Sequence, residues 1–355
     1  MPLHRITRPY FQASLILACL SLALLAGCAA EGPLPTSGEH AETFTSSPDD
    51  LGASRHNITS TPDSRKSTGS SSQIKSQARA TQNLPINAPL TQILLPSETP
   101  AASGTQQTAR YAWMSMSVVP NLSPRIKEVY RQGLALGNNS HAFSKVGDCG
   151  STPAWFLGDF DRGSQFYSLG EYAYLQPVIE YYAGSFLRTS LAAKSGFNAS
   201  SVFTSLWTDR SKCDSDETPL ACEYRHHRPV MAFIMLGTND VFHPEQFEPQ
   251  LRKLLEYSIQ NGVIPILSTK PDNQEGDWSI NATIARLSRE YQVPLWNYWL
   301  ALQSLPDRGL QADGAHITFG TNHFDNPMDM QKGWTLRNLT ALQTLEAIWR
   351  YVNQP

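Results

Sequence analysis

Apolar runs and amphipathic stretches alternate along the chain from about residue 109 to its end. Three continuous apolar runs, at residues 228–240, 262–271 and 292–299, are each closed by a turn, which is typical of strands buried on both faces. A shorter run that ends at Gly147 has the same form, and residues 185–197 indicate a second strand with its following loop. These runs are the expected strands of one sheet.

The stretches between the apolar runs have helical spacing. Residues 245–262, 278–291 and 332–352 are expected to be helices, and Gly262 is placed to end the first of them. Strands that alternate with helices predict right-handed crossovers and a parallel sheet between two helical layers. The predicted fold class is therefore α/β, and in such folds a ligand site lies at the carboxyl ends of the strands.

Three clusters of polar residues lie at the ends of expected strands or just before the last expected helix. GDCGS (residues 147–151) ends the first strand, GTND (237–240) ends a central strand, and DGAH (313–316) precedes the last helix. Each cluster alone is weak evidence, because Gly, Asn and Asp also favour ordinary turns. Because the carboxyl ends of parallel strands meet at one edge of a sheet, the three together indicate a shared site.

The order and content of the clusters resemble those of the SGNH, or GDSL-type, hydrolases. The resemblance covers about residues 140–351. It implies a three-layer α/β/α sandwich with a central five-stranded parallel sheet, a flavodoxin-like arrangement, and the hydrolysis of acyl esters. By the same match, Asp313 and His316 are the acidic residue and the base of a catalytic triad, and Asn239 and Gly196 belong to the oxyanion hole.

The nucleophile position departs from that family, because Cys149 stands where the family has serine. A carboxylate three residues before a histidine can hold one ring nitrogen while the other faces a nucleophile. A thiol beside that histidine has a lowered pKa and attacks as the thiolate. Ser151 is a rival nucleophile if the turn is shifted. The alternatives to ester hydrolysis are an inactive SGNH-fold protein that binds a surface glycan or lipid, and acyl transfer between surface molecules.

The first thirty residues indicate the compartment. Arg5 and Arg8 precede an apolar run that is too short, and wrongly flanked, for a transmembrane helix, as in a secretory signal. The run ends in LAGC (25–28), which resembles the lipobox of bacterial lipoproteins, where the cysteine becomes the lipidated first residue. Residues 1–27 are the expected signal peptide, and Cys28 the expected anchor to the bacterial membrane in an extracytoplasmic location. The alternative is an ordinary signal peptide with a chance cysteine.

Residues 28–108 have the composition of a disordered tether. Between residues 29 and 108, 32 of 80 residues are Ser, Thr or Pro and Phe44 is the only aromatic residue, so little apolar surface is there to offset the entropy of ordering. In an alternative arrangement, the apolar segment 83–96 docks on the body. Residues 109–355 are enough for one hydrolase-like domain.

Cysteine use bears on the nucleophile. The chain has five cysteines, of which Cys19 leaves with the signal and Cys28 takes the lipid. The three that remain are an odd number for a protein outside the cytoplasm. Cys213 and Cys222 flank a short segment of turn residues, and pairing them closes the smallest loop. We expect that disulfide, which leaves Cys149 outside it.

The composition of the chain limits the classes of partner that it can be expected to bind. The chain is 41% hydrophobic with a formal net charge of −3, and no basic run indicates nucleic-acid binding. His226 and His227 are adjacent without another ligand at metal-binding spacing, so we expect a solvated loop there, with no metal and no cofactor. The expected protein is a monomer that acts on an acyl ester of a glycan, a lipid or a small molecule.

Overall fold

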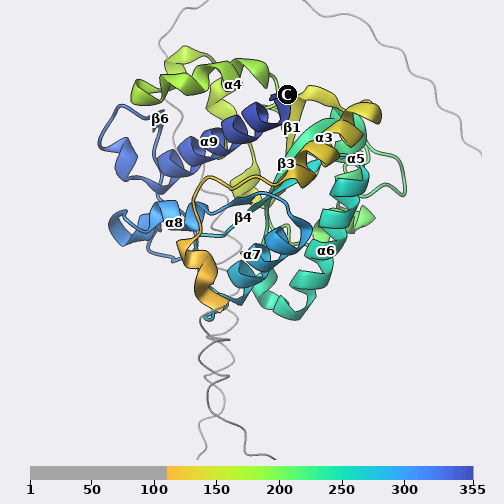
Figure 1. Ribbon diagram of the computed structural model, residues 1–355. Helices are drawn as coiled ribbons and strands as arrows, with labels where there is room; N and C mark the ends of the chain where they lie inside the picture. Colours follow the sequence, from red (N-terminus) through yellow and green to blue (C-terminus); the bar gives the residue numbers. More distant parts are fainter. Residues whose placement is uncertain (1–109, 355) are drawn as a thin grey trace, which may run out of the picture. The chain divides into compact units, whose positions relative to one another are not determined.

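The structure, a computed structural model, describes residues 110–354. The expected signal peptide, the anchor at Cys28 and the tether to residue 108 lie outside the described residues. The core of the domain is a parallel sheet with strand order β1-β3-β4-β5 (Figure 1). Its strands are β1 (Asn139–Gly147), β3 (Pro229–Met235), β4 (Ile264–Ser268) and β5 (Leu295–Trp296). The predicted α/β class with a parallel sheet is confirmed.

The expected second strand of the main sheet is reduced to an isolated bridge. Gly147 pairs in parallel with Ala193 on the side of β1 away from β3. Its N–H donates to the Ala192 carbonyl at 3.1 Å, and its carbonyl accepts from the Lys194 N–H at 3.1 Å. Four strands therefore form the main sheet in the described residues, and the fifth is represented by this bridge. A separate small sheet pairs β2 (Tyr167–Ser168) with β6 (Asn322–His323).

Helices cover both faces of the main sheet. One apolar cluster joins a sheet face to α3 (Pro124–Ala135), α4 (Gln176–Tyr181), α8 (Tyr298–Leu302) and α9 (Gly333–Asn353). The other joins the opposite face to α5 (Pro219–His227), α6 (Pro244–Gln260) and α7 (Ser279–Tyr291). Alternation along β3 explains the division, because Phe233 belongs to the first cluster and Ile234 to the second. The result is the predicted three-layer sandwich.

Short 3-10 helices make up much of the connecting chain. They lie at Ala112–Ser115, Cys149–Ser151, Gly158–Asp161, Ser164–Phe166, Gly170–Leu175, Ser201–Phe203, Ser205–Trp207, Asn239–Phe242, Pro306–Gly309 and Asp329–Gln331. Two of them, Cys149–Ser151 and Asn239–Phe242, start directly at the polar clusters after β1 and β3. These clusters are therefore ordered by local backbone hydrogen bonds as well as by the sheet.

The prediction of a solvated loop at His226 and His227 is wrong. Both histidines end α5, which begins after Thr218, whose hydroxyl accepts the Ala221 N–H at 3.3 Å. The His227 ring nitrogen Nε2 lies 3.0 Å from the carbonyl oxygen of Phe143 in β1. Burial, and then the nearby Arg188 cation, lower the pKa of His227 to about 4, so this side chain packs as a neutral imidazole.

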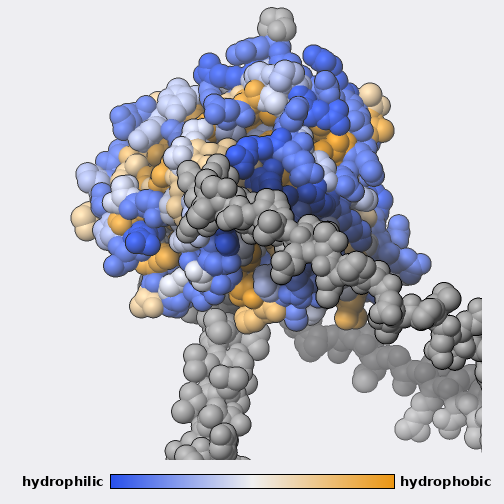
Figure 2. Space-filling model, turned by 60° about the horizontal axis from the view of Figure 1, so that its bottom comes forward, coloured by the Kyte–Doolittle hydropathy of each residue, from blue (hydrophilic) through white to orange (hydrophobic). Residues whose placement is uncertain are grey.

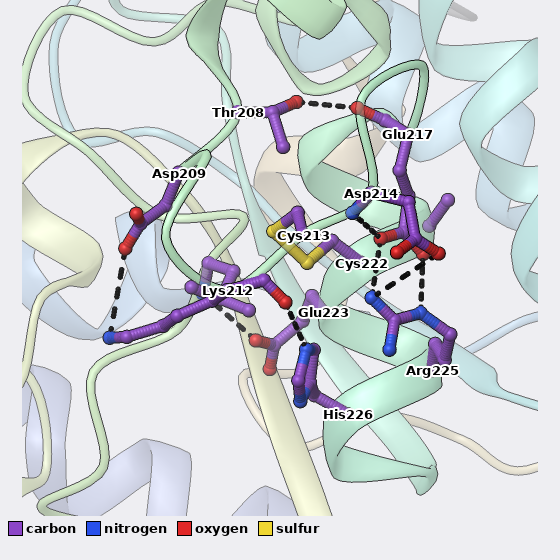
Figure 3. Close-up of a disulfide and its surroundings, with 12 residues drawn as sticks. Thr208, Asp209, Lys212, Cys213, Asp214, Glu217, Cys222, Glu223, Arg225 and His226 are labelled. Atoms are coloured by element: carbon purple, nitrogen blue, oxygen red, sulfur yellow. Dashed lines mark hydrogen bonds and ion pairs between the residues drawn. A yellow bond between two sulfur atoms is a disulfide. The ribbon is translucent and has the colours of Figure 1, made fainter.

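A disulfide joins Cys213 to Cys222, with Cα atoms 5.6 Å apart (Figure 3). Beside it, Arg225 donates from Nε and Nη2 to the two carboxylate oxygens of Glu217, at 2.8 and 2.7 Å. The Thr208 hydroxyl donates to the Glu217 carbonyl at 2.6 Å. The disulfide and these contacts hold the loop that precedes α5 against the helix.

The surface of the domain mixes polar and apolar residues. On the face shown in Figure 2, apolar residues lie in separate small areas among polar ones. None of the helices within residues 110–354 combines the length and the apolar character needed to cross a bilayer.

Candidate active site

The turn after β1 presents Cys149. β1 ends at Gly147, and the Asp148 carboxylate then accepts the Gly150 N–H at 2.9 Å, which caps the 3-10 helix that Cys149 begins. A Cβ on Gly147 would lie 2.1 Å from the Ser151 hydroxyl oxygen and 2.4 Å from the Met235 carbonyl, so only glycine fits there. Cys149 is partly exposed and lies outside the disulfide. The sequence thus places a reachable thiol at the carboxyl edge of the sheet.

Ser151, the rival nucleophile, is fully buried. Its hydroxyl oxygen has no hydrogen-bond partner within the described residues, and it faces the backbone of Gly147. A substrate carbonyl arriving from solvent has no access to a hydroxyl in this position. The geometry therefore favours Cys149 over Ser151.

Asp313 and His316 form a hydrogen-bonded pair on one loop. The His316 ring nitrogen Nδ1 lies 2.6 Å from the Asp313 oxygen Oδ2. The other carboxylate oxygen accepts the backbone N–H groups of Ala315 and His316, each at 3.0 Å. Partial burial alone would raise the pKa of Asp313, but these hydrogen bonds outweigh it and hold the pKa below its ordinary value. The carboxylate thus stays ionised and fixes the ring with Nε2 as the remaining nitrogen.

Neighbouring elements hold this loop in place. The Gln274 side chain, from the segment after β4, donates to the Gly314 carbonyl at 3.0 Å. The Trp334 indole N–H, at the start of α9, donates to the Ile317 carbonyl at 3.0 Å. The Trp334 ring also contacts that of Trp155, on the segment after the cysteine turn, with ring centres 4.5 Å apart. The histidine and the cysteine turn therefore share one region of the sheet edge.

The proposed oxyanion residues lie on two segments that are bonded to each other. The Asn239 side chain donates one N–H to the Phe197 carbonyl at 3.0 Å, directly after Gly196. The neighbouring Asp240 carboxylate accepts the Ala199 N–H at 2.9 Å. Gly196 is exposed and has φ +81°, a backbone conformation that favours glycine. Since an amide carries two N–H groups, Asn239 keeps a second donor for a substrate oxygen.

A cavity of about 40 Å³, with both polar and apolar lining residues, lies beside the cysteine turn. Its size suits water rather than a substrate. It is lined by residues at or after the ends of four strands and by one residue of α9, namely Asp148, Gly150, Ser151, Met235, Leu236, Thr238, Ser268, Thr269, Lys270, Tyr298 and Arg337. The Lys270 ammonium is paired with the carboxylates of Asp272 and Glu275, at 2.5 and 2.6 Å.

Burial raises the pKa of Asp148 in this setting to about 6, although the Gly150 N–H and the Arg337 and His316 charges act in the opposite direction. The sequence reasoning missed the cavity and its charged residues. Arg337 and Lys270 stand at ordinary positions of a helix and of a strand end, where no motif marks a buried charge.

Comparison with known proteins gives distant matches among solved structures. No family model and no curated protein matches the chain. Among solved structures, the chain is similar to a lipolytic protein of the G-D-S-L family from Desulfitobacterium hafniense, with 12% identity, 58% of this chain and 99% of that chain covered, and a TM-score of 0.36. A psychrotrophic esterase from Pseudoalteromonas matches with 14% identity, coverage of 61% and 100%, and a TM-score of 0.36.

A GDSL-like lipase from Bacteroides thetaiotaomicron matches with 14% identity, coverage of 62% and 97%, and a TM-score of 0.36. By their descriptions, two of these proteins are of the type that the three sequence clusters resemble. At such identities and TM-scores the matches carry no argument for the site, which rests on its own geometry.

Proposed function

We propose that this protein is an ester hydrolase that uses Cys149 as nucleophile, His316 as base and Asp313 as the group that orients the base. The observation that carries the proposal is the 2.6 Å contact between Asp313 and His316 Nδ1 on a loop near the cysteine turn. An imidazole held through Nδ1 has Nε2 available to exchange protons with a nucleophile. The partly exposed thiol after β1 is the nucleophile that this arrangement suits.

The proposed reaction has two steps. His316 Nε2 takes the thiol proton while Cys149 Sγ bonds to the acyl carbon, and the imidazolium then gives that proton to the departing alcohol as the ester bond breaks. Water, deprotonated by the same nitrogen, attacks the resulting thioester and releases the acid and the thiol. Donors for the oxyanion are the second Asn239 N–H and the backbone N–H groups of Cys149 and Gly196.

The proposed setting is the outer side of a bacterial membrane, where a lipid on Cys28 anchors the domain through a tether. The LAGC ending of the N-terminal apolar run motivates this part of the proposal. An acyl ester of a glycan, a lipid or a small molecule is the substrate class that the chemistry suits. The competing proposal is that a protein of this fold binds a ligand without hydrolysing it. The observation that supports this alternative is the cysteine in the place of serine.

Hydrolysis of short p-nitrophenyl esters tests the activity. The full chain should hydrolyse them, and Cys149→Ala and His316→Ala should each lower kcat by about a thousandfold or more, because nucleophile and base act as a unit. Ser151→Ala is the matched control and should keep most of the activity. If the unaltered chain hydrolyses no ester, the result favours the alternative function, a binding protein. If only the Ser151 variant loses activity, Ser151 and not Cys149 is the nucleophile.

A further inference from the structure

Arg337 is a buried guanidinium directly behind the cysteine turn. It projects from α9 with 5% of its surface exposed. Its guanidinium carbon lies 4.9 Å from the ring centre of Trp334 and 5.1 Å from that of Phe156. Nη2 donates to the Trp155 carbonyl, and Nε has no hydrogen-bond partner within the described residues. A buried cation with an unsatisfied donor is costly, so its position calls for a nearby negative charge.

The guanidinium approaches the turn at Gly150, which has no side chain. Nη1 of Arg337 lies 3.3 Å from the place where a Cβ on Gly150 would stand, so the glycine gives the guanidinium room to approach. Arg337 and Gly150 also line the same small cavity. Burial lowers the pKa of Arg337, and the interactions with Tyr298, Asp148 and Cys149 act against that change. Because Gly150 directly follows Cys149 in the short 3-10 helix, the guanidinium lies beside the turn that carries the thiol.

We propose that Arg337 acts on the reaction through Cys149, as a positioning residue whose buried charge stabilises the thiolate form of the nucleophile. The inference rests on the proposed function, in which Cys149 is the attacking group. A positive charge a few ångströms away stabilises a thiolate more strongly in a water-poor environment than in solvent. The aromatic rings and the Trp155 carbonyl hold the guanidinium where it can act in this way.

Other charged groups near the turn modify this effect. Asp148, which precedes Cys149 in the turn, opposes the thiolate once it ionises, and a protonated His316 on the catalytic loop favours the thiolate. Lys270, from the end of β4, is held by its two carboxylate partners. Tyr298, after β5, is buried with a pKa raised far above its ordinary value, so it is neutral at physiological pH. Among these groups, all within residues 110–354, Arg337 and His316 are then the cations that favour the thiolate.

The test measures alkylation of Cys149 by iodoacetamide against pH in the full chain, followed on the Cys149 peptide by mass spectrometry. Arg337→Gln removes the charge but keeps a donor for the Trp155 carbonyl, and Arg337→Lys keeps the charge. The Gln variant should shift the alkylation midpoint upward by about one pH unit, a tenfold loss of thiolate below the midpoint. The Lys variant should keep most of the original profile. Thermal unfolding checks that each variant is folded.

Two results would overturn the inference. One is a folded Gln variant with the same midpoint as the unaltered chain, and the other is a Lys variant that shifts as far as the Gln variant. If the Gln variant does not fold, His316→Ala decides, because Arg337 should hold the midpoint below the ordinary thiol value of about 8.5 without the imidazole. A midpoint at or above that value rejects the role. Alkylation needs no ester turnover, so failure of the proposed esterase activity would be seen separately.

Discussion

Asp148 combines a structural hydrogen bond with an unfavourable charge. Its carboxylate caps the short helix that Cys149 begins, yet burial raises its pKa from 3.8 to about 6. Between these two values the folded protein keeps a proton that the unfolded chain has released. The free energy of unfolding therefore falls as pH rises from about 4 to about 6, and stays at the lower level above that range. The turn is held at some expense of stability at neutral pH.

Replacing Asp148 with Asn should stabilise the protein at neutral pH. The amide oxygen still accepts the Gly150 N–H, while the buried charge is gone, and we expect a gain of about 1 kcal/mol at pH 7. The gain should shrink as the pH falls from about 6 to about 4 and should disappear near pH 3, where Asp148 is protonated in both states. Urea unfolding at several pH values measures it, with Asp313→Asn as control. That variant should lose stability at pH 7, because the pKa of Asp313 is lowered in the fold. A constant difference between pH 4 and 7 would contradict this account.

Among the elements, those with a strong local pattern were predictable. The run that became β3 is buried on both faces, and α6 and α7 bury one face each, so periodicity alone finds them. The sequence does not reveal that the expected second strand is only a single bridge, in which Ala193 alone pairs with β1. α5 was missed, although Thr218 and the following Pro219 are an N-cap and a first-turn proline.

The disulfide is the device that secures α5 to its preceding loop. Cys213 and Cys222 are nine positions apart, and cross-linking a loop of this length is expected to stabilise the domain by about 2.5 kcal/mol. The double variant Cys213→Ser with Cys222→Ser should lose that amount in urea unfolding, and the single variant Cys149→Ser should lose little. An equal loss of stability in the double variant and in Cys149→Ser would contradict the expectation that the disulfide stabilises the domain.

For the domain as a whole, the sequence placed the three polar clusters at one edge because parallel strands end on the same side. It gave no sign of the charged cavity below them. Arg337 looks like a polar position of α9, and its burial depends on Trp334 and on Phe156, which comes from a distant part of the chain. Contacts of this kind arise only from the packing of several elements, so single-sequence patterns do not reveal them.

Anchoring of the whole molecule depends on Cys28 in our account. Cys28→Ser should abolish incorporation of a labelled fatty acid, because the thiol is the acyl-bearing group, and the variant should no longer be retained as a mature membrane protein. The Cys19→Ser variant, with its change inside the expected signal peptide, is the matched control and should still be labelled. Unchanged labelling of the Cys28 variant would leave an ordinary secretory signal as the explanation of the N-terminal run.

The central claim, that Cys149 attacks an acyl carbon, is tested most directly by trapping the acyl-enzyme. The full chain is mixed with p-nitrophenyl acetate, quenched in acid within one turnover, and mapped by mass spectrometry. The account predicts an acetyl thioester on Cys149 that hydroxylamine removes, and its loss in Cys149→Ala. An acetyl group on Ser151 instead, or ester turnover with no acylated Cys149, would contradict it.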